Sequence, residues 1–132
     1  MNDIEYLQEY GKKLPESVKK SKWVASPEEH EDRPGQSLAT RNHEVIRQWA
    51  EERRGLPAKI PGTEYDGHPS ILRFSLPGYE IKNLKETSWE DWFKTFDEER
   101  LLFIFQEHLK QGNLSNFFRI ESPFQQKKES SS

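Results

Sequence analysis

The chain contains no cysteine and has no long hydrophobic run. Without cysteine it cannot form a disulfide, a thiolate metal site or a thiol nucleophile. No apolar run approaches the roughly 20 residues that a membrane helix needs, and the N-terminal sequence MNDIEYLQEY lacks the apolar core of a secretion signal. These absences predict a soluble, cytoplasmic protein that has no membrane partner.

The chain also has little net charge. The 20 Lys and Arg residues nearly balance the 23 Asp and Glu residues, which leaves a net charge of -3. No overall field therefore attracts or repels a polyanion, and net charge does not identify a partner. With 132 residues the chain has room for one domain, and its hydrophobic fraction of only 32% indicates that part of it lies outside the core.

Residues 1–37 are predicted to form a disordered or weakly structured arm. Large apolar side chains are sparse in the stretches KKLPESVKKSK and SPEEHEDRPGQS, so they bury too little surface to offset the entropy of ordering the chain. Residues 123–132 are predicted to form a second flexible tail. The alternative for the arm is an amphipathic turn that docks onto another surface, because four apolar residues fall near helical spacing: Ile4, Leu7, Leu14 and Val18.

Residues 38–122 are predicted to form a single α+β domain. Its first helix covers HEVIRQWAEERR, with Thr40 or Asn42 as N-cap and Gly55 in the left-handed position after the helix end. Its second helix starts after Ser88, which begins a variant capping box. One stripe of the second helix is aromatic and must be buried or bound: Trp89, Trp92, Phe93 and Phe96.

Four short segments have the pattern of strands: 57–60, 70–76, 101–108 and 116–120. Alternation in the first two predicts that Ala58 and Leu72 face inward. Lys59 and Arg73 then point outward. The third segment is apolar on both faces, which predicts a central strand. The element order is α-β-β-α-β-β, and we expect both helices to pack on one face of a small, mostly antiparallel four-stranded sheet.

Four segments occur in this order along the chain: HEVIRQWAEERRGLPAKIPGT, ILRFSLPGYE, ETSWEDWFKTFDEERLLFIFQEH and SNFFRI. Together they resemble a family of small uncharacterised bacterial proteins, over residues 38–121. Members of that family sometimes carry the label of a glucan branching enzyme, a name that belongs to much larger proteins with a barrel catalytic domain. A chain of 132 residues cannot contain such a barrel, so the resemblance implies no catalytic residue.

No constellation of residues predicts a catalytic site or a cofactor. The glycines are isolated and none opens a helix, which excludes a known phosphate-binding loop. The four histidines are far apart, and the loop with Glu64, Asp66 and His68 is expected to hold no metal. The acidic residues around the second helix could act as an acid and a base, but they are more simply its solvated face.

The strongest candidate for a binding surface is a basic strip that runs from the first helix onto the first hairpin. Its members are Arg47, Arg53, Arg54, Lys59 and Arg73, with Tyr65 as an accessible aromatic residue. Phosphate contacts and base stacking would suit such a strip to single-stranded nucleic acid. Arg47 and Glu51 can instead pair within the helix, which would leave no binding role for that arginine.

These observations predict a non-catalytic protein-interaction domain with a flexible N-terminal arm, whose partner is another protein. The alternative is a weak nucleic-acid-binding module that uses the basic strip on the first helix and hairpin. We predict no metal and no cofactor. An enzyme would need a deep pocket with converging Asp, Glu and His side chains.

Overall fold

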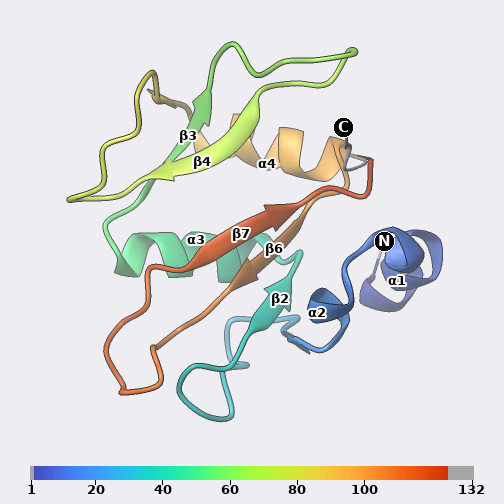
Figure 1. The fold of residues 1–132 in the computed structure, drawn as a ribbon, viewed down its shortest axis with the longest axis vertical. Coiled ribbons are helices and arrows are strands. Elements are labelled where there is room, and N and C mark those ends of the chain that lie inside the picture. Colours follow the sequence, from blue (N-terminus) through green and yellow to red (C-terminus); the bar gives the residue numbers. More distant parts are fainter. Residues whose placement is uncertain (1, 125–132) are drawn as a thin grey trace.

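The computed structural model describes residues 2–124, which adopt the predicted α+β class of fold (Figure 1). The helices are α1 (Asp3–Tyr10), the 3-10 turn η1 (Gly11–Lys13), α2 (Glu16–Lys19), α3 (His43–Glu52) and α4 (Trp89–Glu98). The strands are β1 (Lys22–Trp23), β2 (Leu38–Thr40), β3 (Leu56–Ile60), β4 (Ile71–Ser75), β5 (Lys85–Glu86), β6 (Leu102–Phe105) and β7 (Phe118–Glu121). Most of the predicted tail, residues 125–132, lies outside the described residues.

The strands form two sheets, where one four-stranded sheet was predicted. The larger sheet has the order β1-β2-β6-β7, and the smaller has the order β4-β3-β5. Strand β1 runs parallel to β2, and the other pairings are antiparallel. The prediction that the apolar segment after α4 lies inside a sheet is confirmed, because β6 has β2 on one side and β7 on the other.

Side-chain caps define the starts of the two main helices, as the sequence predicts. The Asn42 side chain accepts a hydrogen bond from the Val45 N–H at 3.0 Å, and the Ser88 hydroxyl accepts one from the Asp91 N–H at 3.0 Å. The end of α3 differs from the prediction, because Arg54 and not Gly55 has the left-handed conformation, with a φ of 59°.

The main core lies where α3 and α4 pack against both sheets. Trp49 of α3 contacts Phe74 of β4 and Phe103 of β6, so one indole connects the two sheets. The buried members of this core are Val24, Leu38, Val45, Ile46, Trp49, Ala50, Leu72, Phe74, Trp92, Phe96, Leu101, Phe103 and Phe105. Both helices thus pack on the strands as predicted, but they pack against two sheets and not on one face of a single four-stranded sheet.

The N-terminal segment forms a second core on the opposite face of the larger sheet. Tyr6 and Val18 are fully buried there, and they pack with Ala39 of β2 and with Leu102 and Ile104 of β6. Figure 1 places α1 and α2 beside β2, far from β3 and β4. The structure thus differs from the expected disordered or weakly structured arm. Because both faces of β6 are apolar, a second layer is needed to cover the face that α3 and α4 do not reach.

Candidate functional site

The structure does not bring the predicted basic residues together on one strip. Arg53 is buried, with 6% of its surface exposed. Its guanidinium donates hydrogen bonds to the carbonyl oxygens of Ser115, Trp49 and Glu107, and it lies 4.3 Å from the centre of the Trp49 ring. Arg53 therefore holds the loop between β6 and β7 against α3 and is not part of a binding surface.

The other basic residues point in different directions. Residues directly opposite in an antiparallel pair share a face, and Arg73 lies opposite Ala58 whereas Lys59 lies opposite Leu72. Lys59 and Arg73 are consequently on opposite faces of the smaller sheet: Arg73 lies away from the face of Leu72 and Phe74 as predicted, whereas Lys59 shares that face, so its predicted outward position is wrong. Arg54 is exposed at the end of α3.

Arg47 is exposed on α3 and lies beside the aromatic stripe of α4. Arg47 pairs with Glu51 at 2.9 Å, and its guanidinium lies 5.8 Å from the ring centre of Trp89. Trp92 and Phe96 are fully buried, while Trp89 is partly buried and packs against the same core. The stripe is therefore a packing surface whose outermost ring is covered by Arg47.

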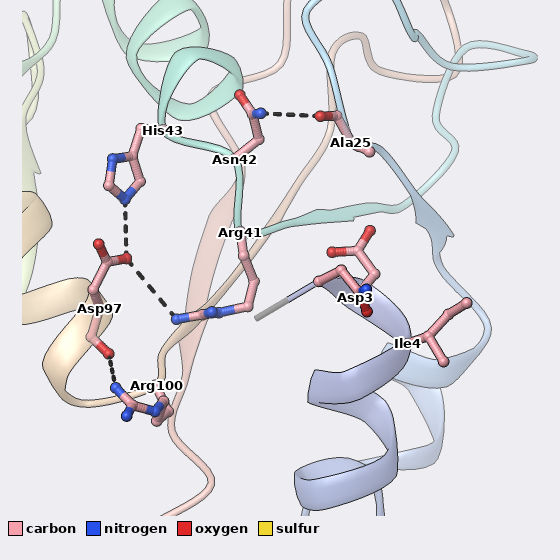
Figure 2. A pocket seen from close by; sticks show the side chains of 9 residues that line it. Asp3, Ile4, Ala25, Arg41, Asn42, His43, Asp97 and Arg100 are labelled. Carbon is pink, nitrogen blue, oxygen red and sulfur yellow. Dashed lines mark hydrogen bonds and ion pairs between the residues drawn. The ribbon is translucent and has the colours of Figure 1, made fainter.

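A polar groove of about 840 Å³ lies between the start of α1, the start of α3 and the end of α4 (Figure 2). Asp97 is at its centre: the Nε2 atom of His43 lies 2.9 Å from the Oδ1 atom of Asp97, and an Arg41 nitrogen lies 4.0 Å from that oxygen. Arg100 donates to the main-chain oxygen of Asp97 at 2.6 Å. The charges of this groove are therefore largely compensated within the protein.

Arg41 also has a structural role in this groove. Its Nε donates to the carbonyl oxygen of Leu101 at 2.9 Å, and its guanidinium lies between the rings of Tyr6 and Phe96, at 4.7 Å and 5.7 Å from their centres. Partial burial raises the pKa of the nearby Asp3 carboxyl, and the Arg41 charge opposes that shift. Arg41 thus connects the N-terminal segment to α4 at this groove.

A second groove, of about 850 Å³, is open and largely apolar. It lies between β4 with the segment that follows it and β7 with the loop that precedes it. Large hydrophobic side chains on both sides are exposed to solvent: Tyr79, Ile81, Leu109, Leu114 and Phe117. Exposed apolar side chains that gather around one groove are typical of a binding surface.

Strands β4 and β7 are edge strands, and they face each other across this groove. Each is the last strand of its sheet, and Figure 1 shows them running in opposite directions. Residues of both strands line the groove, and the ring centres of Phe74 in β4 and Phe118 in β7 lie 5.1 Å apart. We call the region between the two edge strands the seam.

The hydrogen-bond pattern indicates which main-chain groups point into the seam. The carbonyl oxygen of Pro57 accepts from Thr87 on the β5 side of β3, so its partner Phe74 must direct its own N–H and C=O away from β3. Leu72, two residues earlier, does the same. On β7 the carbonyl oxygen of Phe117 accepts from Gln106, so Phe118 and Ile120 point away from β6.

Arg73 lies at the edge of β4 inside the seam. Its Nη1 donates to the carbonyl oxygen of Leu72 at 3.0 Å, one of the groups that face the seam. Burial lowers the pKa of the Arg73 guanidinium, and no carboxylate of the described residues lies within ion-pair distance of it. Arg119, on the opposite side of the groove, is paired with Glu121. Arg73 is therefore a partly desolvated cation without a counterion within residues 2–124.

The sequence patterns did not reveal this groove as a site. Ile81, Leu114 and Phe117 lie in irregular segments, where single apolar residues carry no periodic signal. Tyr65, the aromatic residue of the predicted strip, lies in a separate loop against His68, with ring centres 5.1 Å apart. Large apolar residues close to turn glycines, Tyr79 after Gly78 and Leu114 two residues after Gly112, are the signal in the sequence, but they do not identify which loops meet.

A comparison with known protein families, curated proteins and solved structures found no match. The resemblance to small bacterial proteins therefore stays a prediction. Within residues 2–124, no cluster of three or more His, Asp and Glu side chains is arranged to hold a metal ion. No helix in the described part of the chain has the length and apolarity needed to cross a membrane.

Proposed function

We propose that this protein is a non-catalytic protein-interaction domain that binds an extended segment of a partner protein in the seam between β4 and β7. The observation that carries the proposal is that two edge strands present unpaired main-chain groups to the same apolar groove. An added strand can pair with such an edge, and its side chains can enter the groove. A strand in the seam would join the two sheets into one.

The nucleic-acid alternative has less support from the positions of the side chains. Arg53 is buried, Arg47 is paired, and Lys59 and Arg73 lie on opposite faces of the sheet. A single strand of nucleic acid would need cations along one continuous path. The groove that contains exposed aromatic rings has instead only a few charged residues.

The proposal is tested by selecting phage-displayed random dodecapeptides on the immobilised full-length chain and then measuring amide hydrogen exchange by NMR with a synthesised peptide. We expect exchange to slow at the four amides that face the seam: Leu72, Phe74, Phe118 and Ile120. Binding that leaves these four amides unprotected, or a library that yields no binder, would contradict the proposal. Salt-sensitive binding of an oligothymidylate in place of any peptide would favour the nucleic-acid alternative.

Substitutions in the groove provide a second readout. Ile81→Ser and Phe117→Ser alter exposed side chains, so both variants should fold normally, and each should weaken peptide binding. Ile4→Ser is the matched control, because Ile4 is 68% exposed on α1, away from the groove. Equal losses of affinity in all three variants would show that surface hydrophobicity in general, and not the groove, retains the peptide.

A further inference from the structure

We infer that Arg73 selects the partner of the seam: the bound segment carries an acidic side chain that pairs with this guanidinium. This inference rests on the proposed function. It concerns the chemistry of the bound segment, which we describe as an extended peptide with alternating apolar residues and at least one Asp or Glu. The arguments come from the position of Arg73, from its lack of a counterion and from the bond that it makes to Leu72.

The position of Arg73 is the first argument. Arg73 lines the 850 Å³ groove and also a smaller cavity of about 130 Å³ farther along the seam, so it marks the point where the two cavities meet. Ile120 of β7 lines both cavities as well. A strand that follows the seam must therefore pass directly beside the guanidinium.

The charge balance is the second argument. Two arginines of the seam and the polar groove have a carboxylate neighbour, since Arg119 pairs with Glu121 and Arg41 lies 4.0 Å from Asp97, whereas Arg100 bonds to the main-chain oxygen of Asp97. Arg73 has only the neutral carbonyl oxygen of Leu72. A partly desolvated guanidinium gains more from a carboxylate than from a neutral carbonyl, because the opposite charges attract and a carboxylate can accept two parallel hydrogen bonds. The site is thus complementary to an anion.

The bond to Leu72 is the third argument. The carbonyl oxygen of Leu72 is one of the acceptors that an added strand would use, and Arg73 covers it in the free protein. A strand can pair with this part of β4 only if the guanidinium moves away. An acidic side chain offers the guanidinium a new partner as the strand displaces it, whereas a neutral strand leaves the charge unpaired at the edge. Arg73 therefore both shields the edge and discriminates between incoming segments.

The experiment compares three versions of a peptide selected on the full-length chain: the original with Glu or Asp, the amide isostere, and a version with Lys at that position. We expect the amide version to bind about tenfold or more weakly to the wild-type chain, since it keeps an acceptor but loses the negative charge opposite a partly desolvated cation. In Arg73→Glu the order should reverse, and the Lys version should bind best. Arg119→Glu is the matched control, because Arg119 lines the same groove but already has a partner, and it should keep the wild-type order.

The outcomes separate this inference from the proposed function. If a peptide slows exchange at Leu72, Phe74, Phe118 and Ile120 but binds equally well with Glu or Gln, the seam binds strands and the role of Arg73 is refuted. If Arg73→Leu binds all three peptides more tightly, Arg73 only shields the edge, and the inference also fails. If no peptide protects these amides, the proposed function itself is overturned.

Discussion

The hydroxyl of Tyr6 donates a hydrogen bond to the main-chain carbonyl oxygen of Arg100 at a distance of 2.7 Å. This bond joins α1, near the N-terminus, to the corner between α4 and β6. Tyr6 is fully buried, and burial raises the pKa of its hydroxyl well above the usual range. The N-terminal segment is therefore part of the folded unit, and it positions the face of the larger sheet that lies opposite α3 and α4.

Removing the N-terminal segment should destabilise the whole domain. Deletion of residues 1–37 would expose Ala39, Leu102 and Ile104, which are buried beneath it. We expect a truncated chain that unfolds at a lower urea concentration or aggregates. In the full chain, Tyr6→Ala should lower the free energy of unfolding by about 3–5 kcal/mol. A Tyr6→Ala variant as stable as Ile4→Ala, which changes an exposed residue by comparison, would contradict this view of the segment.

The neighbouring residues Arg53 and Arg54 allow a buried arginine to be compared with an exposed one. Arg53→Met leaves the carbonyl oxygens of Trp49, Glu107 and Ser115 without their donor, so it should reduce the free energy of unfolding by about 3 kcal/mol or more. Arg54→Met makes the same chemical change on an exposed side chain and should alter it by less than about 0.5 kcal/mol. Urea titrations of both variants measure the difference, and equal effects would be inconsistent with a structural role for Arg53.

The cap of α4 should be worth a measurable amount. Ser88→Ala removes the acceptor for the Asp91 N–H, and we expect a loss of about 1 kcal/mol in the free energy of unfolding. Ser88→Asp keeps an acceptor at the N-cap and should restore most of the loss. Thermal unfolding followed by circular dichroism measures both changes. No difference between the Ala and Asp variants would mean that the cap contributes nothing.

The pairing of His30 with Glu107 predicts a weak dependence of stability on pH. The Nδ1 atom of His30 lies 2.7 Å from a Glu107 oxygen, and this hydrogen bond raises the pKa of His30 above its ordinary value of 6.5. Glu52 and Glu28 act in the same direction, while burial opposes the shift. Because the folded-state pKa exceeds the unfolded one, the stabilisation is fully present below about pH 6.5 and is lost as the pH rises through the folded-state pKa.

Urea unfolding between pH 5.5 and 8.5 measures this effect. We expect the midpoint to fall over the upper part of the range and the fall to be smaller in His30→Gln. The effect should be small, because the His30 side chain is 60% exposed and solvent screens the pair. An unchanged slope in His30→Gln would exclude His30 as its source.

Local sequence patterns were sufficient to predict the main helices and their caps. Asn42 and Ser88 start α3 and α4 because their side chains satisfy nearby N–H groups, a relation that needs only residues three positions apart. The central position of β6 followed from its apolar residues on both faces. In β3, Ala58 is fully buried as predicted, but Lys59 shares the face of Leu72 and does not point outward with Arg73. In a five-residue strand that contains Pro and Lys, alternation is too short to define the buried face.

The candidate site depended on contacts that no local pattern contains. Arg53 and Arg54 are neighbours in the sequence with the same charge, yet only the first finds carbonyl oxygens from the loop between β6 and β7. Phe74 and Phe118 are far apart in the chain and become neighbours only when the two sheets pack on α3 and α4. Charge and composition could not predict a seam that forms between separate sheets.

The sequence by itself determined that the chain carries no disulfide, that its residues form an α+β domain, and that α3 and α4 begin at their capping residues. These properties depend on residue chemistry and on short-range hydrogen bonds. Only the tertiary structure decided that the N-terminal segment covers β6, that the strands divide into two sheets, and that β4 and β7 face a common groove. Those outcomes depend on which buried surfaces meet, because burial of apolar area is non-directional and acts between residues at any distance along the chain.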